Sequence, residues 1–144
     1  MKLFDVNILI HCHRRDAENH QAYFSWLQDC FASHEPFAVP SIVMSGFLRV
    51  VTHAAMYKPA TTIADAIEFA EGVRKQANFV EVAPGPRHWE IFAQLCLSIR
   101  ASGKLIPDAY IAAMALESGC EVISADRDFA RFPGLRWRHP LKAK

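Results

Sequence analysis

Three aspartates stand where a parallel α/β protein would gather its acidic side chains. Asp5 follows the short apolar segment KLF, and Asp126 follows the apolar segment VISA. Asp108 comes directly after Pro107 at the start of a helical pattern. Because ligands of parallel sheets collect at the carboxyl ends of the strands, we expect Asp5 and Asp126 to share one sheet edge. Asp108 would be presented to that edge from a helix N-terminus.

The chemistry of these acids depends on whether they converge. Taken singly, Asp5 and Asp126 are ordinary turn residues and Asp108 is an ordinary N-cap. Three carboxylates at one edge would repel one another without a cation, so convergence favours a metal site. Oxygen ligands suit Mg²⁺ or Mn²⁺, which keep several waters and contact phosphate oxygens. The chemistry favoured by such a site is in-line attack of a metal-activated water on a phosphodiester.

The elements that must position the acids alternate along the chain. Apolar residues at helical spacing predict helices from residue 6, over 16–32, over 41–53, from residue 61 or 62, around 89–99 and over 106–119. Shorter apolar runs predict strands over 2–5, 37–40, 78–84 and 120–126. Trp26 and Trp89 fall on the apolar stripes and are expected in the core. This alternation predicts an α/β fold, with a mainly parallel central sheet flanked by helices in one domain over residues 1–144.

The composition narrows the class of protein. The 144 residues are 51% hydrophobic and 22% charged, which is ordinary for one soluble globular domain. A net charge of +1 gives no global attraction to nucleic acid, so a polyanion would need a local basic patch or a bound metal. Four scattered cysteines without zinc-site spacing indicate a reduced, cytoplasmic protein. We expect no signal peptide and no membrane span.

A glycine interrupts one of the predicted helices. The segment SIVMSGFLRV places Gly46 near the middle of the helix over 41–53. Glycine in a helix interior costs about 1 kcal/mol relative to alanine. The local sequence gives no reason for it.

The chain resembles the PIN-domain ribonucleases, and among them the VapC toxins of toxin–antitoxin pairs. The resemblance rests on LFDVNILI, FLRVVT and the long block PDAYIAAMALESGCEVISADRDFARFPGLRW. In that block an Asp-Ala pair opens a small-residue helix, which is followed by a strand and the pattern D-x-D-F-x-R-F. The resemblance implies a PIN-like three-layer fold and a Mg²⁺- or Mn²⁺-dependent endoribonuclease. It also implies a homodimer and a VapB-like antitoxin whose tail enters the acidic pocket.

The resemblance also assigns roles to residues. Asp5, Asp108 and Asp126 take the places of metal-binding acids, with Asp128 as a further contributor. A fourth acid, a Glu, would stand at position 46, where this chain has Gly46 before Phe-Leu-Arg. Around these acids, Asn7 and Ser124 would orient carboxylates or water, and Arg49 would contact phosphate or pair with an acid.

Three interpretations of Gly46 remain open: a Glu that has been altered, a natural variant that uses its remaining acids, or a non-catalytic protein that sequesters antitoxin or RNA. A lost carboxylate would weaken metal binding, so we expect reduced catalysis. A DNA nuclease or a 5′-nuclease relative is a further alternative, because the same acids serve any in-line phosphoryl displacement.

Overall fold

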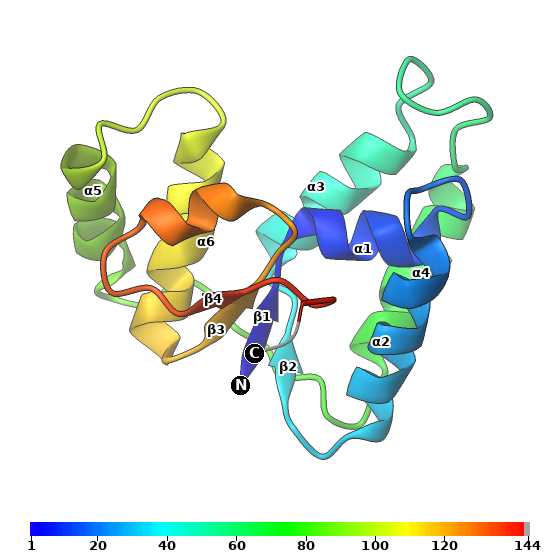
Figure 1. Cartoon of the computed structure of the whole chain (residues 1–144), viewed down its shortest axis with the longest axis horizontal. Helices are drawn as coiled ribbons and strands as arrows, with labels where there is room; N and C mark the ends of the chain where they lie inside the picture. Colours follow the sequence, from blue (N-terminus) through cyan, green and yellow to red (C-terminus); the bar gives the residue numbers. More distant parts are fainter. Residues whose placement is uncertain (143–144) are drawn as a thin grey trace.

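The structure, a computed structural model, describes residues 1–142 and has the expected alternation of strands and helices. In chain order the elements are β1 (Lys2–Phe4), α1 (Val6–His13), α2 (His20–Ala32), β2 (Phe37–Ala38), α3 (Ser41–Val51), α4 (Ile63–Arg74), α5 (His88–Ser98), α6 (Leu105–Ser118), β3 (Glu121–Ile123), the 3₁₀ helix η1 (Arg127–Arg131) and β4 (Trp137–Arg138). Figure 1 shows their arrangement. The prediction of an α/β fold is confirmed.

The four strands form one parallel sheet in the order β2-β1-β3-β4. The central strand β1 pairs with β2 on one side and with β3 on the other, so that Phe4 lies opposite Ile123. All four strands therefore point the same way, and their carboxyl ends meet at the upper edge of the sheet in Figure 1. At this edge Asp5 lies beside the segment that follows β3.

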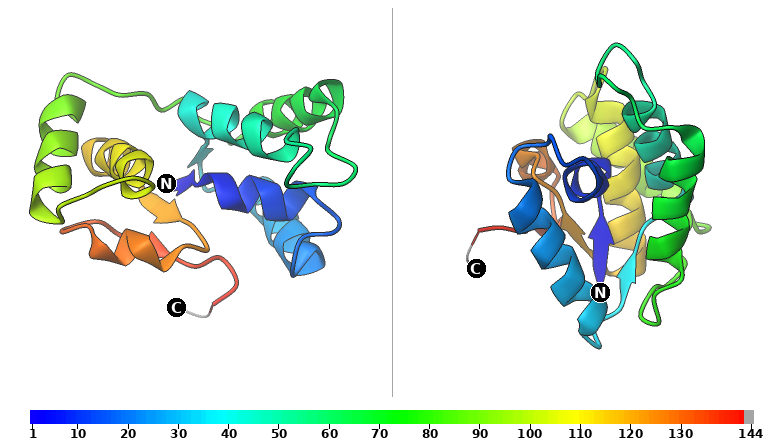
Figure 2. Two further views of the ribbon diagram at one scale, coloured as in Figure 1. Left: turned by 90° about the horizontal axis from the view of Figure 1, so that it is seen from above. Right: turned by 90° about the vertical axis from the view of Figure 1, so that its right-hand side faces the viewer.

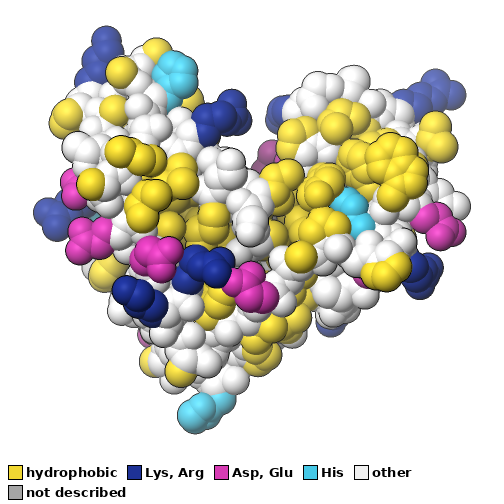
Figure 3. Space-filling view, turned by 180° about the vertical axis from the view of Figure 1, so that it is seen from behind, with side chains coloured by type: hydrophobic (Ala, Val, Ile, Leu, Met, Phe, Trp, Pro, Cys, Tyr) yellow, Lys and Arg dark blue, Asp and Glu magenta, His cyan; other side chains and the backbone are white. Residues whose placement is uncertain are grey.

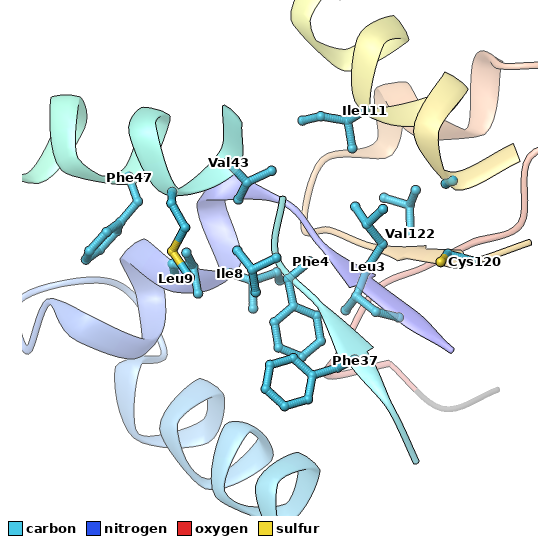
Figure 4. Packing of buried hydrophobic residues seen from close by; sticks show 14 of the residues in the cluster. Leu3, Phe4, Ile8, Leu9, Phe37, Val43, Phe47, Ile111, Cys120 and Val122 are labelled. Carbon is cyan, nitrogen blue, oxygen red and sulfur yellow. The ribbon is translucent and has the colours of Figure 1, made fainter. Parts of the chain in front are cut away.

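Helices cover both faces of the sheet. Figure 2 shows α2 on one side and α3, α4 and α6 on the other, with α1 leaving β1 at the carboxyl edge. The core is built from apolar residues of β1, α1, β2, α3, α6 and β3, as Figure 4 shows. The ring of Phe4 stacks on that of Phe37 with centroids 5.0 Å apart, and Leu3, Ile8 and Phe47 are fully buried. Burial of this kind contributes roughly 1.5–3 kcal/mol for each large side chain.

A hydrogen bond and a backbone conformation determine where α1 begins and where α6 ends, and both positions matter for the site. The Asp5 carboxylate accepts a hydrogen bond from the backbone N–H of Val6 and so caps α1. Helix α6 ends at Gly119, whose φ of 71° is the left-handed conformation that glycine adopts without strain. The chain can therefore turn at once into β3, which brings Ser124 back beside Asp5.

One predicted strand is absent among the described residues, and one observed strand was not predicted. The segment over 78–84 is not a strand: Phe79 forms an isolated bridge to Phe37, and the chain then leaves the sheet toward Pro84. Strand β4, in contrast, was not predicted, because two residues carry too little pattern to be recognised.

The position predicted for Trp89 was also wrong. Its side chain is 73% exposed on the outer face of α5, whereas Trp26 is half-buried against Phe4 as expected. In the described part of the chain, no helix combines the length and the apolar character that a membrane crossing requires.

Candidate metal centre at the carboxyl edge of the sheet

Asp5 is held in a fixed orientation at the end of β1. Its side chain is only 6% exposed. The oxygen Oδ1 accepts from the N–H of Val6 at 2.7 Å, and Oδ2 accepts from Asn7 Nδ2 and from Ser124 Oγ, each at 2.7 Å. Burial raises the pKa of Asp5, while the hydrogen bonds from Ser124, Val6 and Asn7 favour the ionised form and oppose that rise. These donors therefore help to keep a buried carboxylate charged.

Asn7 and Ser124 join the ends of two strands that are distant in sequence. Asn7 Nδ2 also donates to Ser124 Oγ at 2.9 Å, and Asn7 Oδ1 accepts from the N–H of Ala125 at 3.1 Å. Ser124 Oγ accepts from the N–H of Asp126 at 3.0 Å. The network thus fixes the turn that carries Asp126 relative to Asp5. The two residues lie at one edge of the sheet, as the sequence predicted.

A cluster of three carboxylates lies beside Asp5. One oxygen from each of Asp108, Asp126 and Asp128 lies within 4.8 Å of the others, and all three side chains are partly exposed. Asp126 accepts from the N–H of Asp128 at 2.9 Å, so the 3₁₀ turn of η1 folds both acids onto one side. Asp128, expected only as a further contributor, belongs to the cluster, whereas Asp5 flanks it.

Asp108 reaches the cluster from the first turn of α6. The helix begins at Leu105 with Lys104 at the N-cap, so Asp108 is not the N-cap that its position after Pro107 suggested. The pKa of Asp108 is raised to about 7, first by burial and then by the negative charges of Asp5, Asp126 and Asp128. The positive charges of the protein itself therefore do not balance the negative charges of the three carboxylates.

Lys104, which the sequence prediction did not include, supplies a positive charge beside the cluster. Its ammonium lies 3.0 Å from Asp128 Oδ2. Asp128, and after it Asp126 and Asp108, raise the pKa of Lys104. The four-residue interval between Lys104 and Asp108, one helical turn, is the signal that could have pointed to this lysine.

The structure gives Gly46 a local reason that the sequence did not show. A Cβ atom at Gly46 would lie 2.9 Å from Val6 Cγ2, closer than real Cβ atoms approach, so the glycine lets α3 pack tightly on α1. Val6 directly follows Asp5, and position 46 is therefore next to the strand end that carries the acid. Arg49 is exposed on α3 and forms no salt bridge among residues 1–142.

A notch divides one end of the molecular surface. Figure 3 shows the molecule divided at its upper end into two lobes, one formed by α5 and α6 and the other by α3, α4 and the loop between them. The carboxyl ends of the strands meet below this notch.

Comparison with known proteins identifies the family. The PIN domain family matches residues 2–135. Ribonuclease VapC25 of Mycobacterium tuberculosis is 42% identical over 97% of this chain and 99% of its own length. Among solved structures, VapBC-1 from nontypeable Haemophilus influenzae matches 98% of both chains with a TM-score of 0.71 at 14% identity. A toxin-antitoxin complex from Klebsiella pneumoniae covers 99% of this chain and 100% of the matched chain, with a TM-score of 0.62 at 22% identity.

These structural matches share the fold of this chain, and the sequence match covers nearly all of it. The chain belongs to the PIN domain family, within the group of VapC ribonucleases.

Proposed function

We propose that the chain is a metal-dependent endoribonuclease, the toxin of a VapBC-like pair, built as a single PIN domain. The observation that carries the proposal is the grouping of Asp108, Asp126 and Asp128 beside the buried Asp5, in a chain of this family. Carboxylate oxygens are the ligands that Mg²⁺ and Mn²⁺ prefer. The donor set therefore fits the cation that the resemblance implies.

Asp5, Asp108 and Asp126 would hold the cation, with Asp128 able to contribute an oxygen from the same side. When bound, a divalent ion supplies a water of lowered pKa and charge stabilisation for the departing oxygen of the phosphodiester. Asn7 and Ser124, which donate to the Asp5 carboxylate, would hold it in a fixed orientation as a ligand. Asp108, whose pKa lies at about 7, would lose any proton it holds when it takes up the cation.

The absence of a carboxylate at position 46 argues for low activity. Gly46 offers no oxygen, and the contact with Val6 leaves little room for a side chain there. This observation also favours a second candidate, a non-catalytic PIN protein that sequesters antitoxin or RNA. The presence of the other acids weighs against that candidate, because a protein without metal chemistry has no need to gather mutually repelling carboxylates.

The antitoxin would dock in an apolar groove between α2 and α4. The groove has a volume of about 550 Å³ and is lined by Phe24, Leu27 and Phe31 of α2 together with Phe69 and Val73 of α4. Such grooves accept the apolar face of an amphipathic helix. A solved neighbour of this fold is a toxin-antitoxin complex. Phe24→Glu is expected to abolish neutralisation by the cognate antitoxin without changing RNA cleavage.

A homodimer forms the remaining part of the proposal. Trp89 and Leu97 are 73% and 78% exposed, and they lie about two helical turns apart on the same face of α5. A second copy would cover this apolar face. The variant Trp89→Glu/Leu97→Glu should sediment as a monomer, whereas Met56→Glu, which changes an isolated exposed apolar residue, should leave the wild-type dimer intact. A monomeric wild type would contradict this part.

The protein would act in the cytoplasm, where its free cysteines, Cys12, Cys30, Cys96 and Cys120, would stay reduced.

Cleavage assays test the central claim. We expect the chain to cut single-stranded or structured RNA in Mn²⁺, to leave DNA intact, and to lose activity in EDTA. Asp126→Asn should lower the rate at least about 100-fold, because one ligand and one charge are lost. Asp29→Asn, an exposed aspartate on α2, is the matched control and should cut at the wild-type rate. Equal rates for wild type and Asp126→Asn would reject the assignment, and cleavage of DNA would favour a 5′-nuclease-like activity.

A further inference from the structure

Lys104 stands in an unusual place for an exposed lysine. Its side chain is 76% exposed, yet its ammonium lies 3.0 Å from Asp128, one of the three clustered acids. Among residues 1–142 it is the one Lys or Arg that forms a salt bridge with Asp108, Asp126 or Asp128. Arg127 lies between two of these acids in sequence but is exposed and unpaired within the same range. Among these cations the contact is therefore made by the N-cap residue of α6 alone.

The backbone brings Lys104 to the acids in a defined way. Lys104 is the N-cap residue of α6, and Asp108 follows it by one helical turn. The first turn of one helix thus carries both an acid of the cluster and a cation that faces the cluster. Asp128 comes from η1, so the ion pair also connects η1 to the start of α6.

The pair is weak enough to be displaced. A salt bridge this exposed contributes little to stability, because solvent screens it and the lysine side chain loses freedom when it forms. A divalent ion held by several carboxylates competes with it easily. The same ammonium would repel that ion at close range.

We propose that Lys104 is a built-in counter-cation, which occupies the acid cluster when no metal is bound and must move away when metal binds. The inference rests on the proposed metal site and adds a residue that lowers its affinity. Lys104 stabilises the metal-free protein by reducing repulsion among the acids. It opposes metal binding for the same reason.

Calorimetry with Mn²⁺ in low salt, without RNA, tests the inference. Lys104→Gln should bind Mn²⁺ about three- to tenfold more tightly than wild type, because a positive charge near the ion is removed. Lys104→Arg keeps the charge and should bind Mn²⁺ like wild type. Lys75→Gln, which removes an exposed lysine at the end of α4, is the matched control and should also leave the affinity unchanged.

Thermal unfolding supplies a second measurement that does not depend on catalysis. In EDTA, Lys104→Gln should melt below wild type, and saturating Mn²⁺ should abolish or reverse that difference. Equal Mn²⁺ affinity in wild type and Lys104→Gln would overturn the role of Lys104 while leaving the metal site intact, provided that Asp126→Asn binds Mn²⁺ more weakly. If wild type and Asp126→Asn both fail to bind Mn²⁺, the proposed function itself fails.

Discussion

At the scale of single residues, Asp108 shows the combined effect of burial and of neighbouring negative charge on a carboxyl group. Its pKa of about 7 lies above the ordinary value of 3.8, so the folded protein binds a proton between these pH values that the unfolded chain has released. The stability that this proton provides is therefore complete below about pH 4 and is lost as the pH rises through 7. A carboxyl group with this behaviour is costly in the metal-free protein at neutral pH.

We expect Asp108→Asn to remove this pH dependence. In EDTA at pH 7.5 the variant should be more stable than wild type by about 2 kcal/mol, a value reduced for the partial solvent exposure of the side chain. The two proteins should converge below about pH 3, where the wild-type carboxyl group is protonated in both states. Denaturant unfolding across this pH range measures the difference. Parallel stability curves for the two proteins would show that the acids do not interact as described.

The sequence predicted the positions of Asp5, Asp108 and Asp126, named Asp128 only as a further contributor through the resemblance, and gave no role to Lys104. Asp5 and Asp126 could be predicted because a parallel sheet brings its carboxyl ends together. Asp128 and Lys104 depend on the curl of η1 and on the first turn of α6, which have no strong sequence pattern. The contact between Gly46 and Val6 was invisible, because spacing along one helix says nothing of the neighbouring helix.

At the scale of elements, the packing of α3 on α1 sets the limits on position 46. Alanine is favoured over glycine in helices by about 1 kcal/mol, so Gly→Ala normally stabilises a helix. At Gly46 the new methyl group would meet Val6 at 2.9 Å, and valine in a helix has little freedom to turn away. We expect Gly46→Ala to destabilise the protein by about 1–3 kcal/mol, the usual cost of overpacking.

Gly72 of α4 provides the matched control, because an added Cβ atom there has no heavy atom within 4 Å. Gly72→Ala should stabilise the protein by about 0.5–1 kcal/mol in the same denaturant titration. Val6→Ala, combined with Gly46→Ala, should recover most of the loss caused by Gly46→Ala alone. If both glycine substitutions stabilise the protein equally, the helices are not as close as described.

The contact between position 46 and Val6 must be relieved before a carboxylate can be tested at position 46. Gly46→Glu alone would add an oxygen ligand and a clash together, so its effect on cleavage would mix chemistry with packing. In the Val6→Ala background we expect Gly46→Glu to bind Mn²⁺ more tightly and to raise RNA cleavage at least about tenfold, while Gly46→Gln in that background does neither. If Gly46→Glu and Gly46→Gln cut equally, a carboxylate at this position has no role.

Short elements at the rim of the sheet were the hardest part of the fold to predict. Alternation over 78–84 suggested a strand, but these residues are mostly exposed, and the pairing stops after Phe79. Helix α5 was predicted correctly as a helix, and Leu95 of its predicted apolar stripe is buried, but Trp89 at the start of that stripe is exposed. Which apolar face is buried depends on the neighbours that tertiary structure supplies.

At the scale of the whole molecule, the proposed metal would connect segments from both ends of the chain. Asp5 lies near the N-terminus, Asp108 lies in the first turn of the last long helix, and Asp126 follows β3. The unfolded chain does not hold these acids together, so an ion bound to them stabilises the folded state by mass action. At 100 times the dissociation constant this stabilisation is about 2.7 kcal/mol.

We therefore expect Mn²⁺ at that concentration to raise the melting temperature by roughly 8–10 °C, from the usual scaling for a chain of this size. Asp126→Asn should lose most of this shift, because the ion would have fewer ligands. Asp29→Asn on α2 should keep the full shift, since it lies outside the acid cluster. Equal shifts in Asp126→Asn and wild type would mean that Mn²⁺ stabilises the protein from another place, and the acids at the sheet edge would then need a different explanation.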